Sequence, residues 1–157
     1  MACLLLVGVQ FTPISKVPSN PPVKPQMTLE ADPAVPHAAR QVIARACMNC
    51  HSNETKWPWY SRVAPVSWVV AKDVEQARAI VNFSEWGSQD EAVRAGLLAA
   101  ACEDVRSKRM PPPSYIFMHP EARLSAADQA AICSWAGDNL RRLAHAGKQQ
   151  TAQGSNQ

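Results

Sequence analysis

Two cysteines and a histidine within five residues form the segment with the most specific chemistry in the sequence. Cys47 and Cys50 are separated by two residues, and His51 follows directly. Two thiols at this spacing can add to the two vinyl groups of haem, and the adjacent imidazole can then bind the iron. The pattern therefore predicts one haem c, bound covalently through Cys47 and Cys50, with His51 as an iron ligand.

Three other interpretations of the two thiols have less support. A structural zinc site normally requires a second cysteine pair at short spacing, and Cys102 and Cys133 are too far apart in the chain to form one. A thioredoxin-like dithiol belongs in a strand–helix–strand context, which this sequence lacks. The third alternative is that the pattern occurs by coincidence, without a cofactor.

A second iron ligand is expected from farther along the chain. Met110 precedes Pro111, Pro112 and Pro113, and such a stiff segment can hold a thioether against iron without ordering a flexible loop. A thioether ligand stabilises ferrous iron and raises the reduction potential. Met110 is therefore the predicted metal ligand beside His51, and His119 is the next candidate. An open or water-bound position is an alternative, as is Met110 as a core residue. The remaining candidates are Met27, Met48 and Met118.

Four stretches with helical periodicity, and no convincing strand, predict an all-α fold. They cover about residues 38–50, 66–81, 88–108 and 125–143. Ser88 and Glu91 fit a capping box at the start of the third stretch. The third and fourth stretches carry Cys102 and Cys133, which are expected to be small buried side chains rather than a disulfide. An oxidising compartment would nevertheless allow them to pair.

Long irregular connections, at about residues 51–65 and 109–124, separate these predicted helices. Connections of this length are uncommon in a small domain unless they have a function such as binding a ligand. Their large aromatic side chains are Trp57, Trp59, Tyr60, Tyr115 and Phe117. A flat apolar cofactor would give these rings a surface, so Trp57, Trp59 and Tyr115 are predicted to contact it. An indole N–H of Trp57 or Trp59 could also bind a propionate, whereas core packing without cofactor contact is the alternative.

The two ends of the chain differ in composition from its middle. Residues 2–9 are apolar but too few to span a bilayer, and no basic flank precedes them, so 1–11 is interpreted as a truncated export signal or anchor. Residues 12–36 hold seven of the 13 prolines and are interpreted as an extended linker. The haem-binding domain is predicted at 37–146, and a disordered polar tail at 147–157.

Composition limits the class of protein. A chain of 157 residues with 46% hydrophobic and 18% charged residues suits one compact domain. It excludes a collagen, a long coiled coil, a disulfide-dense mini-protein and a multi-span membrane protein. The net charge of +3 comes without a stripe of Lys and Arg, which argues against nucleic acid as a partner.

Five longer motifs lie within roughly residues 39–135: CHSNET, WPWYS, AP-SW, NFS-W and MPP--Y---HP. In these motifs the sequence resembles the bacterial haem-binding domain family that is related to cytochromes c. The resemblance implies a cytochrome c-like, small helical domain whose long loops wrap one haem, with His51 and Met110 at the ligand positions. It also implies export to the periplasm and a possible tether to the inner membrane through the N-terminus. Cys102 and Cys133 are not part of the family pattern.

One haem with two protein ligands, and no spare acid–base cluster, favours a single-electron carrier over an enzyme, so no catalytic residue is predicted. The alternative is a haem-based ligand sensor or a peroxidase-like enzyme, which would need a displaceable distal ligand. A third hypothesis is an accessory domain of a respiratory or sugar-oxidising system. The sequence identifies no redox partner, reduction potential or oligomeric state.

Overall fold

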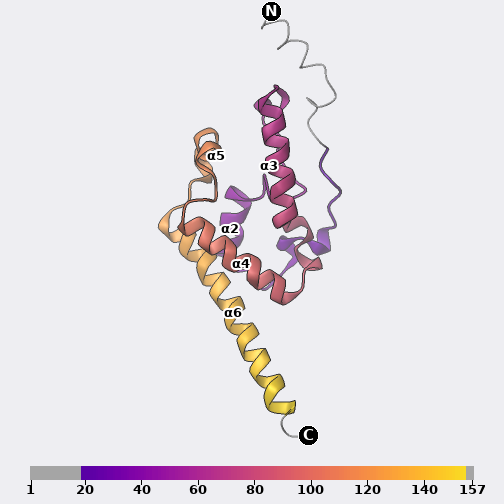
Figure 1. The fold of residues 1–157 in the computed structure, drawn as a ribbon, viewed down its shortest axis with the longest axis vertical. Coiled ribbons are helices and arrows are strands. Elements are labelled where there is room, and N and C mark those ends of the chain that lie inside the picture. The colour runs from indigo at the N-terminus through magenta and orange to yellow at the C-terminus, as the bar shows by residue number, and fades with distance from the viewer. Residues whose placement is uncertain (1–18, 155–157) are drawn as a thin grey trace, which may run out of the picture.

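The computed structural model describes residues 19–154, and every regular element within them is helical (Figure 1). The α-helices are α2 (His37–Ala46), α3 (Val66–Ile80), α4 (Glu91–Arg106), α5 (Pro113–Met118) and α6 (Ala126–Gly154). Short 3-10 turns are η2 (Pro25–Met27), η3 (Leu29–Ala31), η4 (Trp59–Arg62), η5 (Phe83–Ser88) and η6 (Pro120–Ala122). The predicted all-α class is confirmed. The predicted signal or anchor at 1–11 lies outside the described residues.

The core forms where α2, α4 and α6 meet η3 and η5. Ala39, Val42 and Ile43 lie three and four residues apart, so they share one face of α2, and all three are buried. Against this face pack Trp86 of η5 and Trp135 of α6, whose ring centroids are 5.5 Å apart. The two indole rings pack against each other and bury a large apolar area in this small domain.

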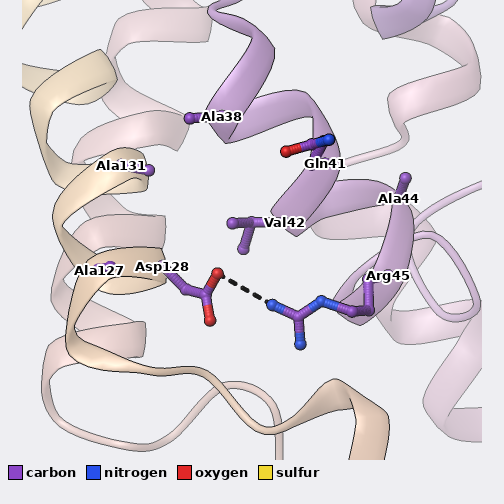
Figure 2. A pocket seen from close by; sticks show the side chains of 8 residues that line it. All are labelled: Ala38, Gln41, Val42, Ala44, Arg45, Ala127, Asp128 and Ala131. Carbon is purple, nitrogen blue, oxygen red and sulfur yellow. Dashed lines mark ion pairs between the residues drawn. The ribbon is translucent and has the colours of Figure 1, made fainter.

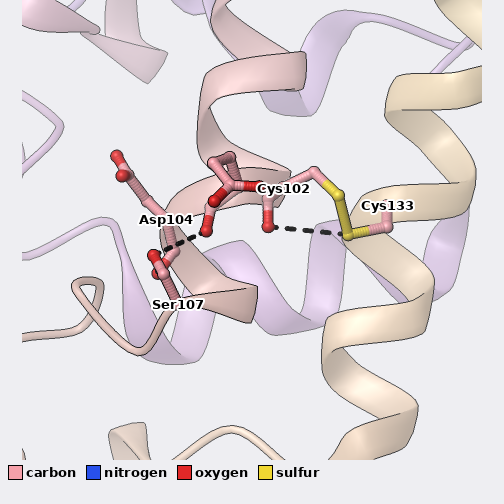
Figure 3. The surroundings of a disulfide bond; sticks show 5 residues. Cys102, Asp104, Ser107 and Cys133 are labelled. Atoms are coloured by element: carbon pink, nitrogen blue, oxygen red, sulfur yellow. Dashed lines mark hydrogen bonds between the residues drawn. A yellow bond between two sulfur atoms is a disulfide. The ribbon is translucent and has the colours of Figure 1, made fainter.

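A disulfide joins Cys102 of α4 to Cys133 of α6 (Figure 3), so the prediction that these two thiols stay unpaired is wrong. The Cα atoms lie 4.8 Å apart, within the range of roughly 4.4–6.8 Å that a disulfide allows. Periodicity placed each cysteine on its own helix but could not show that the two faces meet.

The predicted linker at 12–36 is wrong for its last third. Leu29 and Val35 are buried in the core. Asp32 accepts a hydrogen bond of 3.0 Å from the indole Nε1 of Trp86 and pairs with Arg94 at 3.1 Å. The prolines exclude a long helix here, as predicted, but they do not prevent the segment from packing against one. The folded unit therefore begins before residue 37.

The C-terminal helix α6 starts where the sequence predicted, directly after Ser125, but it ends later than expected. Ser125 N–H donates to Asp128 Oδ2 at 2.8 Å, and Asp128 N–H donates to Ser125 Oγ at 3.1 Å, which is a reciprocal capping box. The helix continues to Gly154, although a disordered tail was predicted from residue 147. Its Lys, Gln and Ala residues have high helix propensity, and this end projects away from the core (Figure 1).

The other helix boundaries follow local sequence signals only in part. No side-chain cap forms at Ser88 and Glu91: α4 begins at Glu91, and Ser88 Oγ donates to the carbonyl oxygen of Glu85 instead. The short α5 was not predicted, and it begins at Pro113, where proline suits the first helical turn. No helix in the described part of the chain is long and apolar enough to cross a membrane.

Candidate functional site

Cys47, Cys50 and His51 lie together on the turn that follows α2. Cys47 N–H donates to the carbonyl oxygen of Ile43 at 2.9 Å. The N–H groups of Cys50 and His51 then both donate to the carbonyl oxygen of Cys47, at 3.2 and 3.0 Å. The turn is thereby fixed by backbone hydrogen bonds, and the two thiols that it carries are free. The structure brings these three predicted residues together.

Both thiols are held in the protonated form. Burial raises the pKa of Cys47 to about 12, with Cys50 adding to the rise and Arg45 opposing it. Burial also raises the pKa of Cys50, with Asp73 adding to the rise and Arg78 opposing it. A dithiol redox centre requires the opposite, because the thiolate is the reactive form. The surroundings of these thiols therefore argue against thioredoxin-like exchange chemistry.

The imidazole of His51 is oriented by the end of α3. Its Nδ1 lies 3.0 Å from the carbonyl oxygen of Ala77 and 3.2 Å from that of Val81. Since a carbonyl oxygen only accepts, Nδ1 carries the proton and Nε2 presents its lone pair. Burial lowers the pKa of His51, opposed by these two carbonyls and by the charge of Asp104, which favours the neutral ring. Metal-binding histidines are oriented in this way.

The chain after His51 is held by partly buried side-chain hydrogen bonds. Arg78 of α3 donates from Nε to the carbonyl oxygen of Ser52 at 2.7 Å and from a terminal nitrogen to Thr55 Oγ1 at 2.8 Å. Asn82 Nδ2 donates to Asn53 Oδ1 at 2.8 Å. The CHSNET and NFS-W motifs therefore meet in space and hold the segment in place. Arg78 is not predictable from the sequence, because nothing in its local pattern marks it.

The two tryptophans of the first connection differ in environment. Trp57 is half-buried and donates its indole N–H to Asn20 Oδ1 at 3.1 Å. Trp59 is 73% exposed, and its ring stands edge-on to Tyr60 with centroids 5.8 Å apart. The indole N–H of Trp57, one of the two predicted as a donor to a propionate, is thus already bonded to Asn20. Trp59 retains an open face for a contact.

Met110 follows the C-terminal turn of α4. Lys108 has a φ of 59°, and the N–H groups of Arg109 and Met110 turn back to the carbonyl oxygen of Asp104, at 2.9 and 3.2 Å. The carboxylate of Asp104 also pairs with Arg109 at 2.8 Å. The charge of this same aspartate acts on His51. Asp104 therefore holds the backbone of Met110, and it lies close along α4 from the disulfide (Figure 3).

Tyr115 and His119 connect α5 to the segment around Cys50. Asn49, between the two cysteines, donates from Nδ2 to Tyr115 Oη at 2.8 Å. The ring of Tyr115 stacks on that of His119, with centroids 4.3 Å apart. His119 Nε2 lies 2.7 Å from Tyr60 Oη, and its Nδ1 lies 3.1 Å from Glu121 Oε1. Both nitrogens of His119 are thus engaged by protein atoms, which disfavours it as an iron ligand relative to Met110.

Apolar side chains are exposed along the same segments. They lie on and just after η4, on the first turns of α3 and on the Met110–α5 segment; they are Trp59, Val63, Val66, Trp68, Val69, Met110, Phe117 and Met118. Among the described residues, no group of three or more His, Cys, Asp and Glu side chains could hold a bare metal ion. Two free thiols, an imidazole with a free Nε2 and an apolar surface instead fit a flat apolar cofactor that carries its own iron.

A groove between α2 and α6 lies apart from these residues (Figure 2). Small side chains such as Ala38 and Ala131 line it, and Arg45 pairs across it with Asp128 at 2.9 Å. Arg45 also donates to the carbonyl oxygen of Arg123 at 3.1 Å. The groove contains none of the predicted site residues, but the hydrogen bond from Arg45 to Arg123 attaches the end of the second long connection to α2.

Comparison with known proteins gives one match. A family model described as a haem-binding domain matches residues 4–138. No curated protein and no solved structure matches the chain.

Proposed function

The chain belongs to the haem-binding domain family, and from this premise we propose that it is an exported carrier of single electrons with one covalently bound haem c. The observation that carries the proposal is the hydrogen bond of His51 Nδ1 to the end of α3, which leaves Nε2 free beside two unpaired thiols. When bound, the haem would supply an iron centre that alternates between the ferric and ferrous states.

The proposed binding residues each have a separate role. The thiols of Cys47 and Cys50 would form thioether bonds, and His51 Nε2 would be the first protein ligand of the iron. Met110 would be the second. Its support is the stiff proline run that follows it, together with its hydrogen bond to the carbonyl oxygen of Asp104. Trp57, Trp59 and Tyr115 would contact the cofactor, since all three lie on the segments that flank Cys50.

The proposed carrier role depends on two protein ligands that leave no position for a substrate on the iron. One observation favours the alternative of a ligand sensor or peroxidase-like enzyme: Met110 is 37% exposed, so its thioether is not locked in place by packing. The carrier proposal is preferred because the acid–base groups Tyr60, His119 and Glu121 bind one another.

The proposed location is the periplasm. A disulfide between Cys102 and Cys133 persists in an oxidising compartment and is rare in a reducing cytosol. In that compartment, thioether bonds to haem would keep Cys47 and Cys50 from forming a disulfide. Anchoring to the inner membrane through residues 1–11 is part of the proposal and rests on the apolar sequence alone. The redox partner is left unspecified.

The proposal is tested by the optical spectrum of protein that has been matured with the c-type haem machinery. Met110→Ala is expected to lose the low-spin, six-coordinate signature and to bind carbon monoxide rapidly when reduced. Met118→Ala is the matched control, because it removes an exposed methionine from the same segment, and its spectrum is expected to equal that of the wild type. An unchanged spectrum in Met110→Ala would refute the ligand assignment. Rapid carbon monoxide binding by the wild type would favour the sensor or enzyme.

A further inference from the structure

Two connections that are far apart in the sequence are joined by one histidine. Tyr60 of η4 lies in the first long connection, and His119 follows α5 in the second. Tyr60 Oη and His119 Nε2 are 2.7 Å apart, which is a short hydrogen bond. Neither residue has a role in binding the iron in the function proposed above, although both lie within the motifs WPWYS and MPP--Y---HP.

The direction of this hydrogen bond follows from the other partner of His119. Its Nδ1 is 3.1 Å from Glu121 Oε1, and a carboxylate oxygen only accepts, so Nδ1 carries the proton. In the neutral ring Nε2 is therefore the acceptor, and the hydroxyl of Tyr60 donates to it. The stacked ring of Tyr115 covers the imidazole, with an interplanar angle of 20°. His119 is thus held by three side chains from η4, α5 and η6.

This contact is coupled mechanically to Met110. Three consecutive prolines, residues 111–113, lead from Met110 directly into α5, and each has a fixed φ. The position of α5 therefore sets the position of Met110 from one side, while the carbonyl oxygen of Asp104 sets it from the other. The hydrogen bond from Asn49 to Tyr115 Oη attaches α5 to the chain between the two cysteines.

We propose that His119 is a positioning residue: by joining η4 to α5 it holds Met110 in place to serve as the second protein ligand of the iron. The inference rests on the function proposed above. Tyr115, which stacks on His119, accepts the 2.8 Å hydrogen bond from Asn49, so this contact lies beside the haem attachment site. His119 acts through α5 and does not bind the iron itself.

The test compares matured, haem-loaded His119→Ala with the wild type. The fraction of reduced protein with an open sixth position should rise, and the association rate of carbon monoxide with it, by about two- to tenfold, the effect of losing one hydrogen bond. The amount of covalent haem should not change. His119→Gln should recover most of the wild-type rate, because its amide oxygen can accept from Tyr60. His37→Ala, at the exposed start of α2, is the matched control and should match the wild type.

A second readout keeps the inference separate from the ligand assignment. Amide hydrogen exchange of residues 116–118 should become faster in His119→Ala and in Tyr60→Phe, which removes a single hydroxyl and keeps the ring. If Met110→Ala leaves the spectrum unchanged, the proposed ligand fails, while faster exchange in these variants would still show that His119 holds α5. Unchanged exchange and an unchanged carbon monoxide rate in His119→Ala would overturn the inference. Failure of His119→Gln to improve on His119→Ala would overturn the hydrogen-bond argument.

Discussion

Removal of the disulfide with Cys102→Ala and Cys133→Ala is expected to destabilise the protein strongly. For a sequence separation of 31 residues, loop closure in the unfolded chain accounts for an entropy of about 12 cal/mol/K, or about 3.7 kcal/mol near room temperature. Alanine is the suitable replacement, since both sulfurs are only half-buried and their removal leaves little cavity. The loss is large for a domain of this size, because total stabilities are about 5–15 kcal/mol.

The assay is urea unfolding of haem-loaded wild type and double variant, each with and without a thiol reductant. Reduction should lower the stability of the wild type to that of the double variant and leave the variant unchanged, because thioether bonds at Cys47 and Cys50 would not be reduced. Cys102→Ala alone is the control and should behave like the double variant. A wild type that is insensitive to reductant, with a double variant of equal stability, would refute the disulfide.

Three further changes test the local structure around the site. Lys108→Gly should raise the free energy of unfolding by about 1 kcal/mol in thermal unfolding, because glycine adopts a φ of 59° without the steric strain that lysine has there. A lower stability would contradict the left-handed conformation of residue 108 after α4. Arg78→Lys should lower the free energy of unfolding by about 1–3 kcal/mol, because lysine cannot bridge Ser52 and Thr55 with a planar fork; equal stability in urea would show that the fork is dispensable. The backbone N–H of Ser125, with smaller contributions from its hydroxyl and from Arg45, lowers the pKa of Asp128. Its stabilisation is therefore complete above an unfolded pKa of about 3.9 and is lost as the pH falls through the lower folded pKa. Asp128→Asn should flatten the acid side of a plot of melting temperature against pH, and an unchanged slope would count against this assignment.

Local signals predicted much of the fold. The helix from His37 to Ala46 repeats apolar residues at three- and four-residue intervals, and this period depends only on neighbouring residues. Pro65 and Asn82 likewise delimited α3 correctly. In α4 the cap was misplaced by a few residues, because Ser88 bonds back to Glu85 rather than forward. Helix ends depend on such competition between partners, which a single sequence does not resolve.

Contacts between distant segments were not predictable. Cys102 and Cys133 were each predicted to be a small buried residue, because nothing within either helix indicates that the helix faces carrying them are in contact. Leu29 lies in a proline-rich segment, and composition alone suggested a solvated linker there. Leu29 belongs to the same core cluster as Trp86, and the indole of Trp86 bonds Asp32, which is 54 residues away in the chain.

The same division applies to the candidate site. Cys47, Cys50 and His51 are close in sequence, so their proximity was predictable, but the helix expected over 38–50 ends at Ala46 and the three residues lie on the turn that follows. The partners that orient His51 come from the end of α3, and the contact of Tyr60 with His119 spans 59 residues. Met110 was identified from its prolines, whereas its link to Asp104 required the structure.

The intact mass of denatured protein tests the central proposal most directly. The chain would be produced with the c-type maturation machinery, stripped of non-covalent cofactor under denaturing conditions and weighed. We expect the wild type to carry the mass of one haem, Cys47→Ala with Cys50→Ala to carry none, and Cys102→Ala with Cys133→Ala to carry it still. A wild-type mass equal to that of the bare chain would contradict covalent attachment at Cys47 and Cys50.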